Sequence, residues 1–347
     1  MTKTIFEIDK NMQNNDTPIS CINEGDTKYY NLNNDYLLGQ AFRNDFKRLP
    51  KGVHVSENVD LLMTHPSGIN IIFKTNSKNI KIKAKLLGKA YMSHMTAVGT
   101  IGFSLYVKVK NKWAFLGASK VNSEEYSVTL ASNLDKKTRT YRLYFPLYQA
   151  LTEAYVGVDN KSSFKFEKPN MDKLVIYGTS ISQGGCATRP GMDYGAILGR
   201  ILGLDVINLG FSGSCKIEAV MTDVLNKIDK KYLILEVESN SPSPEHLQEH
   251  LGYMIKNLKD KDKFKIYLIS HFSDTETLLK KDLRAYRDRY KALQASFSNA
   301  RYLDGEELTK SLCYEGTVDG VHLTDLGFYE LAKKLAKIIK EDIWWDI

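Results

Sequence analysis

The chain has few cysteines and no long apolar run. Its 347 residues include four cysteines, at positions 21, 186, 215 and 313, and no two of them stand at a short, motif-like spacing. Disulfide frameworks and zinc motifs depend on such spacings, so we expect neither, and a reducing compartment is favoured. No segment approaches the roughly 18 apolar residues of a membrane-spanning helix, and the first ten residues lack a secretory core. If the sequence is complete, these absences predict a cytoplasmic protein that does not contact a membrane.

Three motifs of common enzyme classes are also missing. The sequence contains no phosphate-binding loop, no G-x-G-x-x-G dinucleotide fingerprint and no G-x-S-x-G nucleophile elbow. The net charge is +7, but the lysines alternate with acidic residues on predicted helices, as in residues 256–263. We therefore expect no nucleotide cofactor and no nucleic-acid partner, and the positive charge indicates at most an attraction for an acidic substrate.

The N-terminal half alternates strand-like and turn-rich segments. Alternating apolar residues with β-branched or aromatic side chains predict strands over residues 68–74, 79–84, 103–109 and 140–145. Residues before position 37 are rich in Asn, Asp, Gly and Ser, which is typical of irregular structure. The expected unit is an all-β sandwich or jelly-roll over residues 1–168, with an irregular lead-in over residues 1–36.

From residue 169 onward, short apolar strands alternate with segments of helical period. Helices are expected over residues 194–202, 217–228, 245–258, 280–297 and 329–339. This order predicts an α/β domain over residues 169–347, with a mostly parallel sheet buried on both faces. Because the carboxyl ends of parallel strands share one edge of the sheet, functional residues should gather in the loops at that edge.

A serine and a downstream Asp-x-x-His pair suggest nucleophilic chemistry. Ser180 follows the apolar run 174–177, whereas Asp319 and His322 lie on the loop before the last predicted helix. A serine hydroxyl needs a neutral imidazole to accept its proton, and a carboxylate fixes the tautomer of that imidazole. The sequence therefore predicts Ser180 as nucleophile, His322 as general base and Asp319 as the residue that orients His322.

Two further strand ends offer donors for an oxyanion. Gly213 follows the apolar run 206–209, and Asn240 follows the run 232–237. Backbone N–H groups of glycine-rich turns and side-chain amides can stabilise the charge that develops on a substrate oxygen. We expect an oxyanion hole made by the N–H groups of Ser180 and Gly213 together with the Asn240 amide.

These blocks resemble the SGNH (GDSL-like) esterases and acylhydrolases, and in particular a two-domain branch with an N-terminal β-domain. The resemblance is carried by Gly-Thr-Ser-Ile at 178–181, Ala-x-Arg-Pro-Gly at 187–191, Asn-Leu-Gly-Phe-Ser-Gly at 208–213, Phe-Lys-Arg-Leu-Pro at 46–50, and Gly-Phe-Ser-Leu-Tyr at 102–106. The last block has serine where the branch has aspartate. The resemblance implies a three-layer α/β/α, flavodoxin-like catalytic domain and activity on small O-acyl esters, often acetyl groups on carbohydrates.

Several alternatives stay open. The same acyl-serine could pass its acyl group to an alcohol or amine, which would make the protein an acyltransferase, and loss of activity would leave a carbohydrate-binding protein. Arg189 and Lys216 are candidates for binding an anionic part of the substrate. The pair His246 and His250 has the spacing of some zinc ligands but lacks a third ligand, so no metal is predicted.

The remaining reactive residues fit structural roles better. His271, after a predicted strand, is interpreted as a loop histidine, and a thiol nucleophile at Cys186 or Cys215 is a remote alternative. No cofactor is expected. The predicted partner is a small-molecule or carbohydrate O-acyl ester, and a homo-oligomer is possible but does not follow from the sequence.

Overall fold

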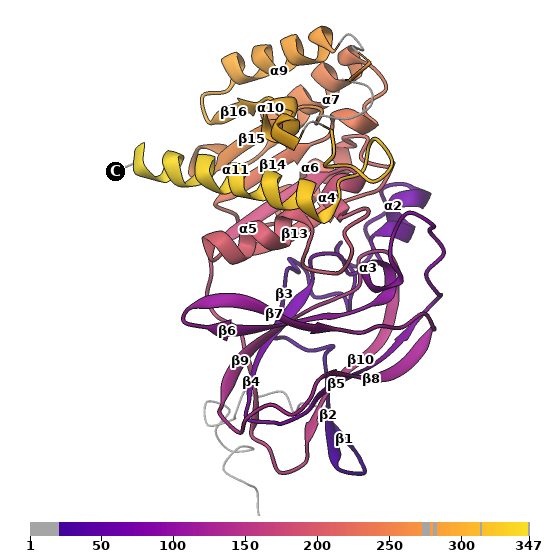
Figure 1. Cartoon of the computed structure of the whole chain (residues 1–347). Helices are drawn as coiled ribbons and strands as arrows, with labels where there is room; N and C mark the ends of the chain where they lie inside the picture. The colour runs from indigo at the N-terminus through magenta and orange to yellow at the C-terminus, as the bar shows by residue number, and fades with distance from the viewer. Residues whose placement is uncertain (1–20, 273–277, 280–282, 313, 346–347) are drawn as a thin grey trace, which may run out of the picture.

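The computed structural model describes residues 21–345, apart from 273–277, 280–282 and 313 (Figure 1). The chain folds into a lower unit built of antiparallel sheets and an upper unit in which helices flank a parallel sheet (Figure 1). The predicted boundary after residue 168 falls in the segment between strands β11 and β12. None of the helices within the described ranges is long and apolar enough to cross a membrane.

Two antiparallel sheets pack face to face in the N-terminal unit. The first has the order β1-β2-β10-β5-β8, formed by Cys21–Glu24, Thr27–Asn31, Leu151–Asp159, Ile80–Leu86 and Glu125–Ala131. The second has the order β11-β4-β9-β6-β7, formed by Phe164–Glu167, Asn70–Thr75, Arg139–Tyr144, Ser104–Val109 and Lys112–Ala118, and β3 (Leu37–Leu38) pairs with β4. Side chains from both sheets, such as Ile82 and Phe73, share one buried core. The predicted β-sandwich is therefore present.

The irregular lead-in predicted for residues 1–36 is wrong for residues 21–31. These residues form the hairpin of β1 and β2, and β2 pairs with β10 along its whole length. Tyr29 is buried on β2, so an apolar position is present although polar neighbours conceal it in the sequence. Residues 1–20 of the lead-in lie outside the described residues.

The C-terminal unit contains a five-stranded parallel sheet. Its order is β13-β12-β14-β15-β16, formed by Asp205–Gly210, Lys173–Gly178, Tyr232–Glu236, Lys265–Ile269 and Ala300–Leu303. This is the doubly wound, flavodoxin-like order, in which the chain reverses direction across the sheet next to the first strand. The reversal places the loops after β12, β13 and β14 side by side.

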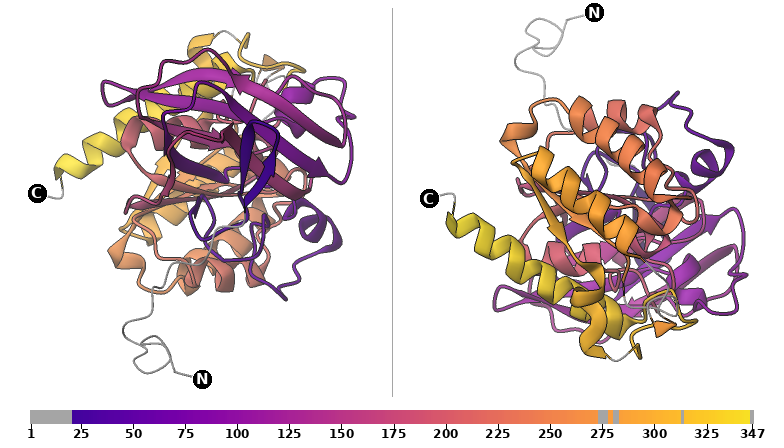
Figure 2. Two further views of the ribbon diagram at one scale, coloured as in Figure 1. Left: turned by 90° about the horizontal axis from the view of Figure 1, so that it is seen from below. Right: turned by 90° about the horizontal axis from the view of Figure 1, so that it is seen from above.

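Helices cover both faces of the parallel sheet (Figure 2). Alternate residues of each strand pack into the two cores under these opposite layers. Leu174 and Ile176 face the core under α5 (Tyr194–Leu202) and α11 (Asp325–Trp345). Val175 and Tyr177 face the other core, under α6 (Ala219–Asn226), α7 (Pro244–Asn257) and α9 (Arg284–Ser296). The helices expected from the sequence are all found; α5 has the expected bounds, and the other four have shifted ends. Residues 280–282 of the expected segment 280–297 lie outside the described ranges.

Several shorter elements are also present among the described residues. They are α2 (Glu57–Leu62), α3 (Ala97–Ile101), α4 (Ser180–Gln183), α10 (Gly305–Thr309), and the 3-10 turns η2 (Glu238–Asn240), η3 (Lys261–Lys263) and η4 (Lys310–Leu312). The four-residue helix α4 carries the predicted nucleophile directly after β12, and η2 carries Asn240 directly after β14.

The two units share a polar and apolar interface that reaches the end of the parallel sheet. Leu49 and Val59 of the N-terminal unit are part of the core under α6 and α7. The Gly39 N–H donates to Asp205 Oδ1 at 2.7 Å, and the Ser67 hydroxyl donates to the Gln183 carbonyl oxygen at 2.5 Å. The N-terminal unit therefore supports α4 as well as the far edge of the sheet.

Candidate active site

Ser180 stands at the sharp turn between β12 and α4. A β-carbon at Gly178 would lie only 2.2 Å from the Ser182 hydroxyl oxygen, so only glycine fits where the strand meets the helix. Thr179 caps α4, because its side chain accepts the Ile181 N–H at 3.3 Å. As the first residue of α4, Ser180 has a backbone N–H without an intrahelical acceptor.

The buried side chain of Glu236 holds this turn through hydrogen bonds. Glu236, at the end of β14, accepts hydrogen bonds from the Thr179 hydroxyl at 2.8 Å and from the Ser182 hydroxyl at 2.8 Å, and also accepts the Thr179 N–H at 3.2 Å. The Tyr194 hydroxyl lies 2.7 Å from Ser182. Burial raises the pKa of Glu236, while these hydrogen bonds act in the opposite direction. The turn that carries Ser180 is thus tied to the neighbouring strand on both sides of the nucleophile.

The structure brings Ser180, His322 and Asp319 into one hydrogen-bonded chain, which we call the candidate triad. Ser180 Oγ lies 3.0 Å from His322 Nε2, and His322 Nδ1 lies 2.7 Å from Asp319 Oδ2. Ser180 and His322 are half-buried, and they are separated by 142 positions in the chain. This is the arrangement in which an imidazole can take a proton from a serine while a carboxylate holds its tautomer.

Asp319 also shapes the loop that presents His322. Its Oδ1 accepts the backbone N–H groups of Val321 at 3.0 Å and His322 at 2.7 Å. Gly320, between the two triad residues, has a φ of +88°, which glycine adopts at no steric cost. Partial burial tends to raise the pKa of Asp319, but the hydrogen bonds from His322 and Val321 outweigh it, so the pKa lies below its usual value. The carboxylate is therefore ionised at neutral pH.

The two predicted oxyanion segments lie next to each other. Gly213 has a φ of +65° in a turn closed by the Ser214 N–H, which donates to the Phe211 carbonyl oxygen at 3.0 Å. Asn240 Oδ1 accepts the Cys215 N–H at 3.1 Å, which ties η2 to this turn. The Asn240 Nδ2 group has no hydrogen-bond acceptor among the described residues, so it is free to donate to a ligand. The roles of these groups in an oxyanion hole stay a prediction.

The N-terminal unit places two side chains next to the candidate triad, and the sequence did not predict either of them. The buried Tyr148, from the segment after β9, donates its hydroxyl to the Ser180 carbonyl oxygen at 3.3 Å. His94, between β5 and α3, places its ring 5.8 Å from the His322 ring. Neither residue stands in a recognisable motif, because only the docking of the two units brings them to the site.

Arg48 links the same interface to the turn that carries Gly213. Its guanidinium donates to the Gly210 carbonyl oxygen at 2.6 Å and to the Leu62 carbonyl oxygen at 2.8 Å. The Arg48 Cζ atom lies 4.6 Å from the centre of the Phe211 ring. Complete burial lowers the pKa of Arg48 to about 9, so the cation still persists at neutral pH. A residue of the Phe-Lys-Arg-Leu-Pro block thus holds the end of β13 in place.

The two candidate substrate-binding cations have different surroundings. Arg189 donates to the Tyr106 hydroxyl at 2.6 Å and lies 3.7 Å from the centre of the Phe115 ring, so it packs against the N-terminal sheet. Lys216 is exposed and donates to the Asn240 carbonyl oxygen at 2.7 Å, beside the predicted oxyanion segments. Lys216 is therefore the better placed of the two to meet a substrate, and both roles remain predictions.

The histidines proposed as possible zinc ligands have structural partners, and the two cysteines near the site are buried. The His246 and His250 rings stack at 4.0 Å, and the Ser241 hydroxyl lies 3.0 Å from His246 Nδ1. Burial raises the pKa of Cys186 to about 12, so its thiol stays protonated at neutral pH, and burial raises the pKa of Cys215 as well. A thiolate nucleophile is therefore disfavoured at both positions.

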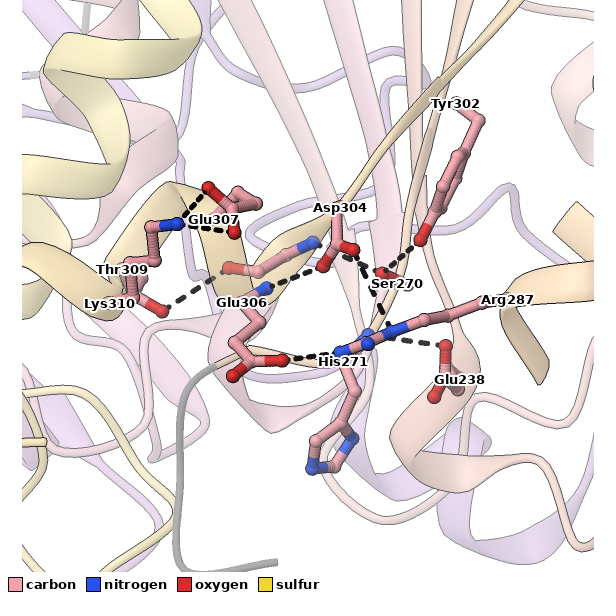
Figure 3. A network of polar contacts seen from close by, with 11 residues as sticks. Glu238, Ser270, His271, Arg287, Tyr302, Asp304, Glu306, Glu307, Thr309 and Lys310 are labelled. Atoms are coloured by element: carbon pink, nitrogen blue, oxygen red, sulfur yellow. Dashed lines mark hydrogen bonds and ion pairs between the residues drawn. The ribbon is translucent and has the colours of Figure 1, made fainter. Parts of the chain in front are cut away.

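A second polar network occupies the carboxyl ends of β14, β15 and β16 (Figure 3). The His271 N–H donates to Glu238 Oε2 at 3.2 Å, and His271 Nδ1 lies 3.2 Å from the Ser239 hydroxyl. Arg287 bridges Asp304 at 3.7 Å and Glu306 at 2.5 Å. His271 therefore has structural partners on η2, the turn that carries Asn240.

Comparison with known proteins agrees with this architecture. The family model of the GDSL-like lipase/acylhydrolase family matches residues 171–340, and the model of the GxDLY N-terminus of SGNH-hydrolase-type esterases matches residues 27–164. No curated protein sequence matches the chain.

Three solved structures illustrate the likeness. A GDSL-like lipase of Bacteroides ovatus is 30% identical with a TM-score of 0.84, covering 91% of this chain and 97% of its own. A salicylyl-acyltransferase of a tetracycline biosynthetic pathway (15% identity, TM-score 0.68, 91% and 90% coverage) and a family two carbohydrate esterase of Clostridium thermocellum (14%, 0.60, 80% and 93%) share the fold. The chain thus belongs to the GDSL-like lipase/acylhydrolase family and is an enzyme of the esterase class.

Proposed function

We propose that the chain is a serine esterase that hydrolyses small O-acyl esters, acetyl esters first among them, carried by a carbohydrate. Ser180 Oγ attacks the ester carbonyl carbon while its proton passes to His322 Nε2. The tetrahedral intermediate collapses as His322 protonates the leaving alcohol, which produces an acyl-serine. Water then attacks the acyl carbon with His322 again as base, and collapse releases the acid and restores the Ser180 hydroxyl.

One observation carries the proposal. The distance of 3.0 Å between Ser180 Oγ and His322 Nε2 suits proton transfer in both directions without rearrangement. The distance of 2.7 Å between His322 Nδ1 and Asp319 Oδ2 lets the carboxylate hold the imidazole in the tautomer that accepts this proton. Negative charge on the intermediate would be met by the N–H groups of Ser180 and Gly213 and by Asn240 Nδ2. Removing one such donor costs about 3 to 4 kcal/mol of transition-state stabilisation in other enzymes.

The substrate class is inferred from the relatives and from the rim of the site. Structures of the family two carbohydrate esterase are in complex with a cello-oligosaccharide, and this likeness supports an esterified glycan as the substrate here. Val318 and Val321, on the loop that carries Asp319, expose 46% and 38% of their surface, and they offer apolar contacts to a sugar face or acyl group.

Acyl transfer is a second candidate, because a structural relative is a salicylyl-acyltransferase. The acyl-serine would form in the same way, but an acceptor alcohol or amine would take the place of water in the second step. Adding candidate acceptors to the assay distinguishes the two functions. A transferase gives the acylated acceptor in preference to free acid, whereas an esterase gives free acid at an unchanged rate.

The first test is hydrolysis of p-nitrophenyl esters from acetate to octanoate by the wild type, Ser180→Ala and His322→Ala. Both variants should lose at least about 10³-fold in kcat, as removal of either partner does in other serine hydrolases.

Ser296→Ala and His250→Ala are the controls, because they replace the same residue types on α9 and α7, and they should behave as wild type. Equal activity in all five proteins would overturn the triad. In a second assay, release of acetate from acetylated oligosaccharides tests whether the substrate is a glycan ester.

A further inference from the structure

Four side chains with metal-binding atoms surround the candidate triad. His94, Cys186, Asp319 and His322 each place one ligand atom within 4.8 Å of the other three. His94 comes from the N-terminal unit, Cys186 from the segment after α4, and the other two from the loop before α11. Of these four residues, only Asp319 and His322 have a part in the proposed ester hydrolysis.

We propose that these four residues form a site for one divalent transition metal ion of the zinc class, and that the bound ion switches the esterase off. Two imidazoles, a thiolate and a carboxylate are the ligand types that Zn²⁺ takes in proteins. The Cys186 thiol is protonated in the metal-free protein, and it releases its proton to solvent when the ion binds. Mg²⁺ and Ca²⁺ prefer oxygen ligands alone, so the nitrogen and sulfur atoms argue against them. The proposed ion is an inhibitor, and the reaction itself does not use it.

The geometry needs only a small adjustment to close around an ion. Bond lengths of about 2.0 to 2.3 Å put the ligand atoms of a tetrahedral zinc site about 3.4 to 3.8 Å apart. The longest separation here is 4.8 Å, so the ligands must approach by about 1 Å. His94 is exposed and able to turn toward the other three, whereas Cys186 is buried and Asp319 is held by three hydrogen bonds. Cys186 and Asp319 are therefore held in place, and a turn of the His94 ring would bring its nitrogen to the ion.

Inhibition follows whichever nitrogen of His322 binds the ion. Coordination through Nδ1 displaces Asp319, which lies 2.7 Å from that nitrogen, and leaves the ring proton on Nε2, so that no lone pair faces Ser180. Coordination through Nε2 occupies the lone pair that accepts the Ser180 proton across 3.0 Å. In both cases His322 cannot act as general base. This consequence rests on the proposed function, whereas metal binding itself does not.

Cobalt titration tests the site without any esterase assay. Co²⁺ occupies zinc sites, and a cobalt–thiolate bond gives a charge-transfer absorption that imidazole and carboxylate ligands do not. The wild type should show this absorption and saturate at one ion per chain. Cys186→Ser should abolish it, and His94→Ala should weaken cobalt binding at least tenfold. Cys21→Ser and His250→Ala replace a thiol and an imidazole elsewhere and should titrate as the wild type does.

Inhibition by Zn²⁺ is then measured on p-nitrophenyl acetate, with each variant compared with its own metal-free rate. Zinc should inhibit the wild type reversibly, with full recovery on adding EDTA, and His94→Ala should need at least tenfold more zinc. Because His94 is exposed, its replacement should leave the fold unchanged. Ser180→Ala should still bind cobalt.

The two proposals fail in different ways. An absent thiolate absorption, or equal zinc sensitivity of His94→Ala and His250→Ala, would overturn the metal site and leave the esterase standing. Cobalt binding that depends on Cys186 and His94 in a protein without esterase activity would support the site and overturn the proposed function.

Discussion

The Tyr148 hydroxyl of the N-terminal unit donates a hydrogen bond to the Ser180 carbonyl oxygen at 3.3 Å. The contact is tight, because a β-carbon at Gly185 would lie 2.9 Å from this hydroxyl and 3.3 Å from His322 Cδ2. Burial raises the pKa of Tyr148, so the phenol stays a hydrogen-bond donor at all physiological pH values. The β-sandwich therefore takes part in positioning the nucleophile as well as in packing against its domain.

Replacing Tyr148 with Phe should lower kcat without changing KM. The variant leaves the Ser180 carbonyl with one donor fewer, and a displaced Ser180 would cost about tenfold in kcat. The free energy of unfolding should also fall by about 1 kcal/mol. Tyr126→Phe is the matched control, because its buried hydroxyl donates to the Ile101 carbonyl oxygen at 2.6 Å inside the sandwich. Kinetics and urea unfolding of both variants separate the two effects, and an equal kcat in both would rule out positioning by Tyr148.

The candidate triad could be predicted because each of its two parts carries a signal in its own stretch of sequence, although 142 positions separate Ser180 from His322. Ser180 follows a continuous apolar strand, and Asp319 and His322 share one loop, so spacing alone brings each near the sheet edge. Tyr148 and His94 gave no such signal, and for Arg48 the Phe-Lys-Arg-Leu-Pro block indicated the family but not a place in the site. They reach the site from loops of the sandwich, and only the packing of two separately folded sheets determines where those loops lie.

The fold shows the same division between local and non-local signals. Central strands such as β12 and β14 are buried on both faces and therefore appear in the sequence as uninterrupted apolar runs. Strand β1 at the edge of its sheet is fully exposed, and β16 at the edge of the parallel sheet is only half-buried. Their polar residues carry no clear period, so pairing with a neighbour, and not composition, makes them strands.

Replacing Asp319 with Asn should lower kcat about 10³- to 10⁴-fold with little change in KM. An asparagine amide can stabilise the wrong tautomer of His322, which then has no lone pair facing Ser180. Because the pKa of Asp319 lies below its usual value, the carboxylate is ionised at both pH 6 and pH 8, and the loss should be similar at both. Asp325→Asn is the control, since that carboxylate accepts the Thr188 N–H. A loss of less than tenfold in Asp319→Asn would argue against its orienting role.

Two substitutions of Asn240 distinguish an oxyanion donor from a structural tie. Asn240→Ala removes both the Nδ2 donor and the Oδ1 acceptor of the Cys215 N–H, whereas Asn240→Asp keeps an acceptor for that N–H. If Nδ2 stabilises the oxyanion, both variants should lose about 10²- to 10³-fold in kcat. If Asn240 only holds the turn, the Asp variant should retain activity and the Ala variant should lose it. Measuring kcat on p-nitrophenyl acetate decides between these outcomes.

Glu238, two residues before Asn240, should make the stability of the protein depend on pH. Burial raises its pKa from 4.5 to about 7, although the His271 charge and N–H and the Arg287 charge oppose this, and nearby Asp304 raises it further. One carboxylate oxygen, Oε1, has no hydrogen-bond partner among the described residues. Below about pH 7, Glu238 is therefore mostly in its protonated form in the folded protein.

The sign of the pH dependence follows from proton release on unfolding. Between about pH 4.5 and pH 7 the folded protein keeps the Glu238 proton and the unfolded chain does not, so the free energy of unfolding falls as the pH rises, by at most about 3 kcal/mol. Glu238→Gln cannot ionise and keeps a carbonyl acceptor for the His271 N–H, so it should lose less stability than the wild type between pH 5 and pH 8. Urea unfolding at both pH values measures this difference, with the exposed Glu249→Gln as control. Equal losses in Glu238→Gln and the wild type would mean that Glu238 is ionised in the folded protein across this range, and that solvent or a neighbouring cation compensates for its burial.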